Sequence, residues 1–596
     1  DTSRIAAWRR GEGPLSGAEV DLAEKLAHFR RLTAAANQVE DIAEALLTVL
    51  APAPAAAAPA AAPAELTAEQ ATRLLLAHPK VAGWLERYPR DPATAAELDG
   101  GRGTWTVRVW SGRAGQVAEG RVDDASGRVL EAWTGPQVAW KMARGSPGAF
   151  GGKILNEPAV WLALCAAFLL GLGNLRRPLS LHNLDLLALL AFSVSLAFFN
   201  RGDVFASVPL VYPPLVYLLA RTAWIGFRGR GAGPPRPVWP VWLVAAATVF
   251  LVGFRVGLNV EAPRGVIDVG YAGVIGADRI LDGRMPYGNM PVRDSRPACG
   301  EPDADGDVRE RIQENGRCEA ANERGDTYGP AGYLAYVPAV AAFGWSGRWD
   351  SLPAAHATSI AADLLVLAGL VLVGSRFGGA RLAVSLAFSW AAYPFTAYAL
   401  NANTNDAFMP ALLVWGFWLA SSPWARGGLT AFASWTKFAA LLLVPLWATY
   451  PALDVRRLLR FALAFVVATA ASFSVLLLEP ALLDAARTFW DRTLGFQLRR
   501  ASPFSLWDWG RYHALGIPDL AVAQHVLQAG VLVLAGVAAV LPTRKGPLEL
   551  AALTAAVLLG FELVLTHWFY LYLPWVLPFV VLALFLPRAR RAAGSC

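Results

Sequence analysis

The chain has 596 residues, of which 55% are hydrophobic and 17% are charged, and its mean hydropathy is +0.38. These values exclude an ordinary soluble globular protein and indicate that much of the chain lies in a lipid bilayer. The formal net charge of +7 would suit a nucleic-acid-binding protein, but the arginines cluster between apolar segments. We therefore expect them to orient a membrane protein and expect no nucleic-acid partner.

The N-terminal region, residues 1–64, carries a helical pattern followed by an Ala/Pro-rich stretch. The prolines of residues 45–64 favour a linker, and the alternative is a degraded signal-peptide core with small-residue cleavage sites. We expect this segment to lead into a small α+β domain at residues 65–150.

The small domain is expected to open with a helix at residues 66–87. Alternating apolar residues then predict strands at 105–110, 116–122 and 128–133, and the last two strands are joined by a turn at 123–127. The helix followed by a hairpin with the sequence VDDASGRVLEAW resembles a PepSY-type domain. Because no catalytic constellation stands out in it, the resemblance implies a binding or regulatory module.

The remainder of the chain reads as a series of apolar segments of membrane-spanning length, each interrupted by Arg, Pro or Gly. The pattern predicts a mainly α fold, a polytopic transmembrane bundle over residues 158–590. We count about thirteen segments: 158–175, 184–200, 204–226, 238–258, 328–345, 353–374, 380–400, 406–422, 428–450, 458–478, 519–541, 547–565 and 567–586.

Basic residues in short loops predict the orientation of the bundle, because such loops are usually cytoplasmic. The clusters are Arg176-Arg177, residues 228–236, Arg456-Arg457 with Arg460, Arg544-Lys545 and residues 588–591. The small domain and two long loops, 259–327 and 479–518, then lie outside the cell. The orientation of residues 353–450 stays open, since strict alternation conflicts there with the charge bias.

The first outer loop contains two cysteines, Cys299 and Cys318. In an oxidising compartment we expect them to form a disulfide, and the alternative is two unpaired thiols. Between them, Asp303, Asp305 and Asp307 offer oxygen ligands at alternate positions, which suits Ca²⁺. The run lacks the full twelve-residue calcium pattern, so a solvated acidic loop is the favoured interpretation and no catalytic metal is assigned.

The same loop contains GVIDVGY at residues 265–271, GRMPYG at 283–288 and GDTYGP at 325–330. Two further polar elements, NANTND at residues 401–406 and WTK at 435–437, interrupt apolar segments. In this order the elements resemble those of the polytopic C-superfamily glycosyltransferases, which use polyprenyl-phosphate sugars. The third element is an imperfect version of the family's Y-P-P pattern. The only outer D-x-D pair, Asp303 and Asp305, lies in the insertion between the two cysteines, which leaves metal use in doubt.

The resemblance implies that Asp268 is the general base, because sugar transfer needs a carboxylate to accept the proton of the acceptor hydroxyl. The alternative is an Asp that caps the following helix, 269–282. A leaving lipid phosphate requires cations. Lys437, Arg499 and Arg500 are the candidates, although Lys437 could instead extend to the membrane interface and the arginines could belong to an interfacial belt.

Eight polar or aromatic residues remain as candidates for positioning donor or acceptor: Tyr271, Tyr287, Asp326, Tyr328, Asn405, Asp406, His567 and Tyr570. For His567 a hydrogen-bonded structural histidine is the favoured alternative.

The resulting expectation is a transferase of the bacterial cytoplasmic membrane that moves a sugar from a lipid-linked donor to a glycan, lipid or protein acceptor on the outer face, in contact with membrane lipids. Two alternatives stay open. A transporter or lipid flippase should show internal repeats, and we find none. A non-catalytic envelope assembly protein would use the small domain for binding.

Overall fold

A computed structural model describes residues 65–100, 103–135, 138, 150–229, 239–291, 297–299, 310–312, 316–320, 325–347, 351–500, 502–512 and 519–587. The expected helix and linker of residues 1–64 lie outside this part of the chain. Apart from Gly100, the described residues fall in one compact unit, residues 65–99 and 103–596. Within it, buried apolar side chains form two separate cores, one in the small α+β domain and one in the helical bundle.

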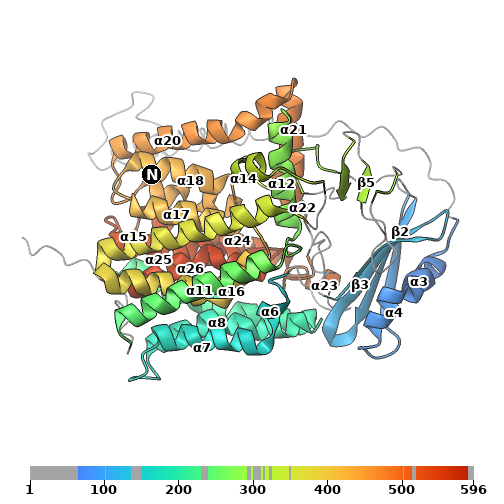
Figure 1. The fold of residues 1–596 in the computed structure, drawn as a ribbon, viewed down its shortest axis with the longest axis horizontal. Coiled ribbons are helices and arrows are strands. Elements are labelled where there is room, and N and C mark those ends of the chain that lie inside the picture. Colours follow the sequence, from blue (N-terminus) through green and yellow to red (C-terminus); the bar gives the residue numbers. More distant parts are fainter. Residues whose placement is uncertain are drawn as a thin grey trace, which may run out of the picture. The chain divides into compact units, whose positions relative to one another are not determined.

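The small domain is a four-stranded antiparallel sheet in the order β1-β2-β3-β4, with two helices (Figure 1). Its elements are α3 (Ala68–Ala77), α4 (Pro79–Leu85), β1 (Ala93–Asp99), β2 (Thr104–Ser111), η1 (Gly112–Ala114), β3 (Gly115–Asp123) and β4 (Val129–Thr134). The core face of the sheet alternates with a polar face, as β2 shows: Val107 and Val109 are fully buried, and Arg108 between them forms an ion pair with Glu97.

Two details of the small domain differ from the sequence prediction. The expected single helix is divided into α3 and α4, because Pro79 cannot continue α3 and instead begins α4. Strand β1 was not predicted, since its sequence ATAAELD has a single β-branched residue and no aromatic residue to mark a strand. The turn after β3 holds the domain together: Asp124 accepts hydrogen bonds from the backbone N–H of Glu65 and from Trp105 Nε1.

The bundle is built from apolar helices. Among the described residues, seven helices are long and apolar enough to cross a membrane: Leu181–Asn200, Val204–Arg228, Val241–Glu261, Pro353–Ala392, Val455–Leu478, Ala521–Val540 and Pro547–Val564. Five shorter apolar helices accompany them: Pro158–Leu172, Pro330–Phe343, Phe408–Trp418, Phe438–Ala448 and Tyr570–Phe585. The expectation of a polytopic membrane helical protein with a small N-terminal sheet region is confirmed at this level.

Several of the expected apolar segments, such as 204–226, 328–345 and 428–450, are divided into shorter helices. The individual elements of the bundle are α6 (Lys153–Asn156), α7 (Pro158–Leu172), α8 (Leu181–Asn200), α9 (Val204–Ser207), η2 (Val208–Val211), α10 (Tyr212–Arg228), α11 (Val241–Glu261), α12 (Asp268–Leu281), α13 (Pro330–Leu334), α14 (Val337–Phe343), α15 (Pro353–Ala392), α16 (Pro394–Asn401), α17 (Phe408–Trp418), α18 (Pro423–Ser434), η3 (Phe438–Leu443), α19 (Val444–Ala448), α20 (Val455–Phe473), η4 (Ser474–Leu478), α21 (Leu482–Arg492), α22 (Leu494–Arg499), α23 (Trp509–Tyr512), α24 (Ala521–Val540), α25 (Pro547–Val564), η5 (Tyr570–Tyr572) and α26 (Leu573–Phe585). A short two-stranded sheet, β5 (Glu310–Ile312) and β6 (Cys318–Ala320), lies in the first long loop.

Helix α15 is interrupted at Gly379, whose φ of 69° lies in the left-handed region that favours glycine. A Cβ on Gly374 would lie 2.3 Å from the Cα of Ala383, so the segments before and after Gly379 pack directly against each other. The sequence prediction of two apolar segments, 353–374 and 380–400, agrees with this break.

A buried ion pair joins two of the apolar helices. Arg255 of α11 donates to Asp363 Oδ1 of α15 at 2.8 Å, and both side chains are almost fully buried. The same guanidinium donates to the Trp390 carbonyl at 2.9 Å, and Trp390 Nε1 donates to Asp363. A charge this deeply buried requires such partners, so the pair fixes the position of α11 against α15.

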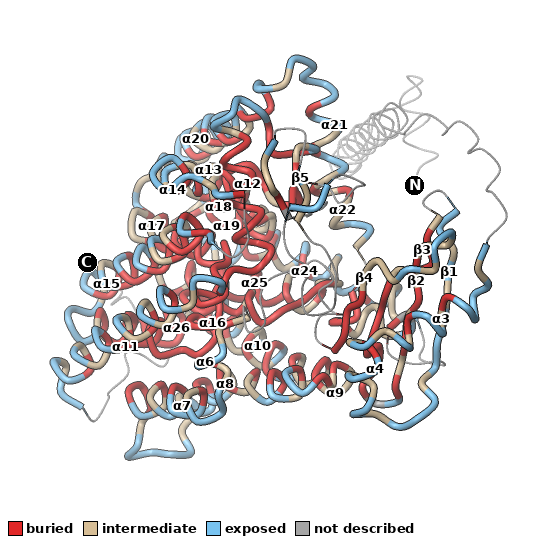
Figure 2. Tube along the Cα trace, turned by 45° about the vertical axis from the view of Figure 1, so that its right-hand side comes forward, coloured by how far each residue is buried: buried red, intermediate tan, exposed pale blue. Residues whose placement is uncertain are grey.

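In Figure 1 most helices of the bundle run in nearly one direction, among them α7, α8, α11, α15, α17, α18, α20, α25 and α26. Helices α12 and α21 run across that direction at one end. Buried segments of α25, α26 and α16 lie in the middle of the bundle, as the red tube in Figure 2 shows. The candidate site is formed where α12 begins.

Candidate functional site

A polar pocket opens at the start of α12 and encloses about 510 Å³ of space not filled by protein atoms, open solvent included. Its charged and polar lining comes from segments that are far apart in the sequence: Asp268, Thr327, Tyr328, Asp406, Lys437, Arg500, His567 and Tyr572. The other lining residues are Val269, Ala272, Gly325, Phe496, Phe569 and Leu571. Six of the residues singled out in the sequence therefore meet in one place.

Asp268 is the first residue of α12 and is 7% exposed. Ile267 occupies the N-cap position, so the alternative role of Asp268 as the helix cap does not hold. The backbone N–H of Ile267 donates to the Ala402 carbonyl at 3.1 Å. In this way the polar NANTND segment is held against the start of α12.

Gly270 makes this approach possible. A Cβ at this position would lie 2.2 Å from the carbonyl oxygen of Asn403, which is far inside van der Waals contact. Asn403 has a φ of 52° and donates through Nδ2 to the Gly265 carbonyl at 2.8 Å. Asn tolerates this left-handed conformation better than most residues, and the resulting turn directs residues 404–406 toward the pocket.

Lys437 lies at the break between α18 and η3 and is only 8% exposed. Its Nζ forms an ion pair with Asp406 Oδ1 at 2.9 Å, and Trp575 Nε1 of α26 donates to the same oxygen at 2.9 Å. The ammonium is therefore held inside the protein and is not extended to the membrane interface. Its Nζ also lies 4.7 Å from the ring centroid of Tyr328.

Tyr328 is positioned by two backbone contacts. The hydroxyl of Tyr287 donates to the Tyr328 carbonyl at 2.9 Å. A Cβ on the next residue, Gly329, would lie 2.1 Å from the carbonyl oxygen of Trp435, so the TYGP and WTK segments pack backbone against backbone. Burial, and after it the negative charge of Asp268, raises the pKa of Tyr328 well above its ordinary value, and the phenol is neutral.

Arg500 and His567 also line the pocket. Arg500 Nη2 lies 3.0 Å from His567 Nε2, and His567 Nδ1 lies 2.9 Å from Ser502 Oγ. Because a guanidinium can only donate, Nε2 is the acceptor and the ring proton resides on Nδ1. Burial, and then the charge of Arg500, lowers the pKa of His567 well below its ordinary value, so the ring is neutral.

The remaining residues predicted from the sequence support the pocket or lie elsewhere. Tyr287 and Asp326 tie the GRMPYG segment to its neighbours, since Asp326 accepts from the Gly288 backbone N–H at 2.8 Å. The others do not line the pocket: Tyr271, Asn405 and Tyr570 are buried, and Arg499 is exposed. Tyr570 hydrogen-bonds Ser195 Oγ at 2.7 Å, which is a packing role.

Sequence reasoning did not identify several lining residues, notably Thr327, Phe496, Phe569 and Tyr572. In a chain with this many aromatic residues, an aromatic side chain in an apolar context gives no signal. Tyr572 stacks on Trp575 with ring centroids 4.2 Å apart, and Trp575 is the residue that donates to Asp406. Its place beside a buried polar pair is visible only in three dimensions.

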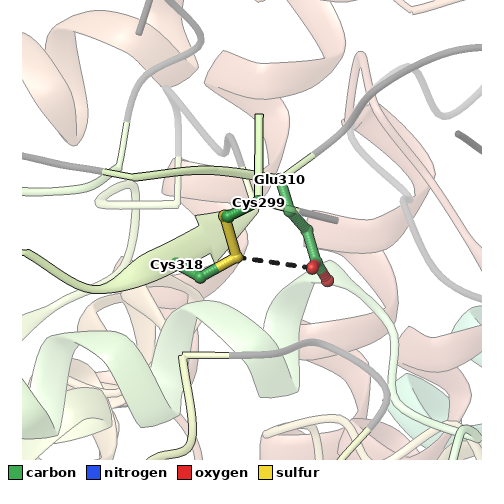
Figure 3. Close-up of a disulfide and its surroundings, with 3 residues drawn as sticks. All are labelled: Cys299, Glu310 and Cys318. Carbon is green, nitrogen blue, oxygen red and sulfur yellow. Dashed lines mark hydrogen bonds between the residues drawn. A yellow bond between two sulfur atoms is a disulfide. The ribbon is translucent and has the colours of Figure 1, made fainter. Parts of the chain in front are cut away.

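The expected disulfide between Cys299 and Cys318 is present, with a Cα–Cα distance of 5.9 Å (Figure 3). Glu310 of β5 lies with a carboxylate oxygen 3.6 Å from the Cys318 Sγ, and β5 pairs with β6. Beside the disulfide, Arg317 forms an ion pair with Asp278 near the C-terminal end of α12. The bridged hairpin is thereby attached to the helix that begins with Asp268.

No group of three or more His, Cys, Asp or Glu side chains is arranged to hold a metal ion within the described residues. The proposed calcium ligands Asp303, Asp305 and Asp307 lie outside that part of the chain.

A second, apolar groove has a volume of about 1290 Å³, open space included. It is lined by residues of α13, α15, α17 and α18: Ala331, Leu334, Ala335, Thr358, Ala361, Ala362, Leu365, Phe408, Ala411, Leu412, Trp415, Leu419, Leu429, Phe432 and Thr436. Thr436 in the groove directly precedes Lys437 in the pocket, and Phe408 follows Asp406 by two residues. The polar and apolar spaces are thus lined in part by residues that are close together in the chain.

A scan against protein-family models, a search of curated proteins and a search of solved structures found no match to this chain.

Replacing Gly270 by Ala should separate α12 from the NANTND segment, because the new Cβ meets a backbone carbonyl that cannot rotate away. We expect a loss of about 1–3 kcal/mol, typical of overpacking, seen as a lower melting temperature of the purified protein. Gly257→Ala in α11 is the matched control, because nothing lies within 4 Å of a Cβ there, and it should be neutral or slightly stabilising. Equal melting temperatures for both variants would contradict the close packing described above.

His567 should make the protein less stable in acid. The pKa of His567 is lower in the folded protein than in the unfolded chain, where it is about 6.5. At a pH between these two pKa values the imidazole is protonated in the unfolded chain but not in the folded protein. Stability is therefore full above about pH 6.5 and falls as the pH is lowered toward the folded-state pKa. Melting temperatures from pH 5 to 8 should show this fall, and His567→Gln, whose amide oxygen can still accept from Arg500, should flatten it. An unchanged pH profile in the variant would exclude His567 as the cause.

Proposed function

We propose that this protein is a membrane glycosyltransferase that transfers a sugar from a polyprenyl-phosphate-linked donor to an acceptor hydroxyl. One observation carries the proposal: a carboxylate, Asp268, and two cations, Lys437 and Arg500, line a single pocket, and the residue before Lys437 lines an apolar groove. The pocket would bind the sugar and the phosphate of such a donor, and the groove would bind its long hydrocarbon chain.

In the proposed reaction the oxygen of the acceptor hydroxyl forms a bond to the anomeric carbon of the sugar. The bond between that carbon and the phosphate oxygen breaks, and the bonding electrons leave with the lipid phosphate. Asp268 accepts the hydroxyl proton as general base. Its location at the positive N-terminal end of α12 and its near-complete burial keep the carboxylate in a fixed position at the pocket wall.

The leaving lipid phosphate gains negative charge, and cations that are already in place stabilise it without reorganisation. Arg500 and Lys437 fill this role in the proposal, and Asp406 positions Lys437 through their ion pair. Arg499 is not retained as a phosphate ligand, because its side chain is exposed and does not line the pocket. Thr327 and Tyr572 supply hydroxyls to the pocket that suit the sugar.

The apolar groove supports a lipid-linked donor over a soluble nucleotide sugar. Its lining is almost entirely Ala, Leu, Phe and Trp, and only two threonines contribute polar atoms. Burying hydrocarbon there would stabilise binding by about 0.8 kcal/mol for each CH₂ group. The donor's phosphate would then lie where Thr436 of the groove meets Lys437 of the pocket.

The finer topology belongs to the same proposal. The proposal includes thirteen membrane segments, a bacterial cytoplasmic membrane and a pocket on the extracytoplasmic face. This topology suits a lipid-linked donor. It also suits the basic residues of the short loops and the disulfide in the loop beside α12. The small domain, PepSY-like in its hairpin, would serve as a binding or regulatory module for the acceptor or a partner. The likeness to C-superfamily glycosyltransferases rests on the order of the polar elements.

The direct test is sugar transfer by the purified protein from a polyprenyl-phosphate donor. Asp268→Asn should reduce kcat by about 10²- to 10⁴-fold, the usual contribution of a general base, with little change in melting temperature. The matched control is Asp282→Asn at the other end of α12, where the carboxylate is half exposed and pairs only loosely with Arg317 at 3.5 Å. The control should keep full activity.

Full activity in Asp268→Asn would remove the proposed base. Absence of transfer together with substrate counterflow in vesicles would instead identify a transporter.

The role of the groove can be tested separately with Ala361→Phe, which places a bulky ring in the groove from an exposed position of α15. If the ring excludes about two CH₂ groups of the lipid from the groove, the lost burial should raise the KM for a long-chain donor roughly tenfold. The KM for a short-chain analogue should change little. Ala523→Phe, at an exposed position of α24 outside the groove, is the control. The same KM increase for both chain lengths would argue against a lipid in the groove.

A further inference from the structure

A short amphipathic helix, α21, follows directly after a membrane span. The span Val455–Leu478 ends at Leu478, and α21 begins at Leu482 after a three-residue connector. Three extended residues reach at most about 11 Å, so the start of α21 must remain close to the end of the span. In Figure 1, α21 runs across the direction of α20 and not along it, and Figure 2 likewise places it at the end of α20.

The side of α21 that contacts the protein is well defined. Ala485 and Phe489 are buried, and the ring of Phe489 contacts Tyr287 and Phe473, in each case with centroids 5.0 Å apart. Tyr287 in turn holds the backbone of Tyr328 in the polar pocket. The helix is therefore docked on the bundle and is not a projecting loop.

The rest of the α21 surface is divided into two arcs. At about 100° per residue, Leu482, Leu483, Ala486 and Trp490 lie within one arc of roughly 100° beside the docked side. This apolar arc is exposed: Leu483 is 76%, Leu482 51% and Trp490 49% accessible.

The second arc of α21 carries only charged residues. It contains Asp484, Arg487 and Asp491, all exposed, and the first two are joined by a weak i,i+3 ion pair at 3.4 Å. Apolar and charged residues are thus separated around the helix and not mixed.

We infer that α21 lies in the surface of the lipid bilayer, with its apolar arc in the hydrocarbon boundary and its charged arc in water. Three observations agree on this partner. The helix emerges from a span whose own exposed side chains, such as Leu463 and Val466, are large and apolar. It turns across the bundle axis, and Trp490 is the residue type that concentrates at headgroup depth. A helix of this kind sits about 5–10 Å into the headgroup and acyl boundary.

The bilayer fits the apolar arc better than a second protein does. A protein partner would have to cover Leu482, Leu483 and Trp490 while leaving the adjacent lipid-facing side of α20 in the membrane. The bilayer covers both surfaces at once. Arg487, at the edge between the two arcs, is placed to reach lipid headgroup phosphates.

The test is site-directed spin labelling of the full chain in phospholipid vesicles, in a background where Cys165 and Cys596 are replaced by Ser. Leu483→Cys and its neighbour Asp484→Cys form a matched pair about 100° apart on the helix, and Val466→Cys on α20 is the lipid-facing reference. The label at 483 should show a several-fold higher ratio of oxygen to water-soluble nickel collisions than the label at 484. Its ratio should approach that of the reference.

Two outcomes would overturn the inference. Equal, high nickel accessibility at 483 and 484 would place α21 in bulk water, and shielding of 483 from both reagents would show that protein covers it. Melting temperatures of the labelled variants confirm that each is folded, and since 483 and 484 are exposed neither change should lower them. The result is independent of any transferase activity.

Discussion

The ion pair between Lys437 and Asp406 is the interaction on which the polar centre of this protein depends. Each residue lies at a break between apolar helices, where the backbone is already irregular, and each is almost fully buried. An unpaired charge at such a site would cost several kcal/mol, so either residue alone would be unfavourable. Together, and with Trp575 donating to Asp406, they connect the starts of α17, η3 and α26 around one point.

Around this pair the pocket is assembled by backbone contacts that only glycine permits. Gly270 lets α12 approach the Asn403 carbonyl, and Gly329 lets the TYGP segment approach the Trp435 carbonyl. Both contacts bring a polar element of the first long loop against a helix break in the bundle. The result is that Asp268 and Tyr328 share a cavity with Lys437 although they come from different parts of the chain. A second buried ion pair, between Arg255 and Asp363, holds α11 against α15.

The sequence predicted the apolar helices well, because a run of about twenty apolar residues has few other stable environments. It also singled out Lys437, since a charge inside an apolar context is costly enough to need a reason. Asp268 and Asp406 were singled out by the resemblance of their motifs to those of a glycosyltransferase family. The sequence could not rank Arg500 above Arg499, because neighbouring residues on a short helix end point in different directions. Nor could it identify Tyr572 or strand β1, whose residue types are common in their surroundings and whose positions are set by tertiary packing.

The charges of the pocket suggest how a phosphate would be recognised. Lys437 already shares its charge with Asp406, whereas within the described part of the chain Arg500 forms no ion pair and donates instead to His567. The histidine is neutral, because burial and the adjacent guanidinium both oppose its protonation. Arg500 therefore keeps its full positive charge while its direction is fixed by a hydrogen bond. A guanidinium held in this way presents its remaining donors to a lipid phosphate in a fork that an ammonium cannot offer. In the proposed reaction Arg500 would bind the phosphate directly, and Lys437, held by Asp406, would stabilise the charge that develops as the sugar leaves.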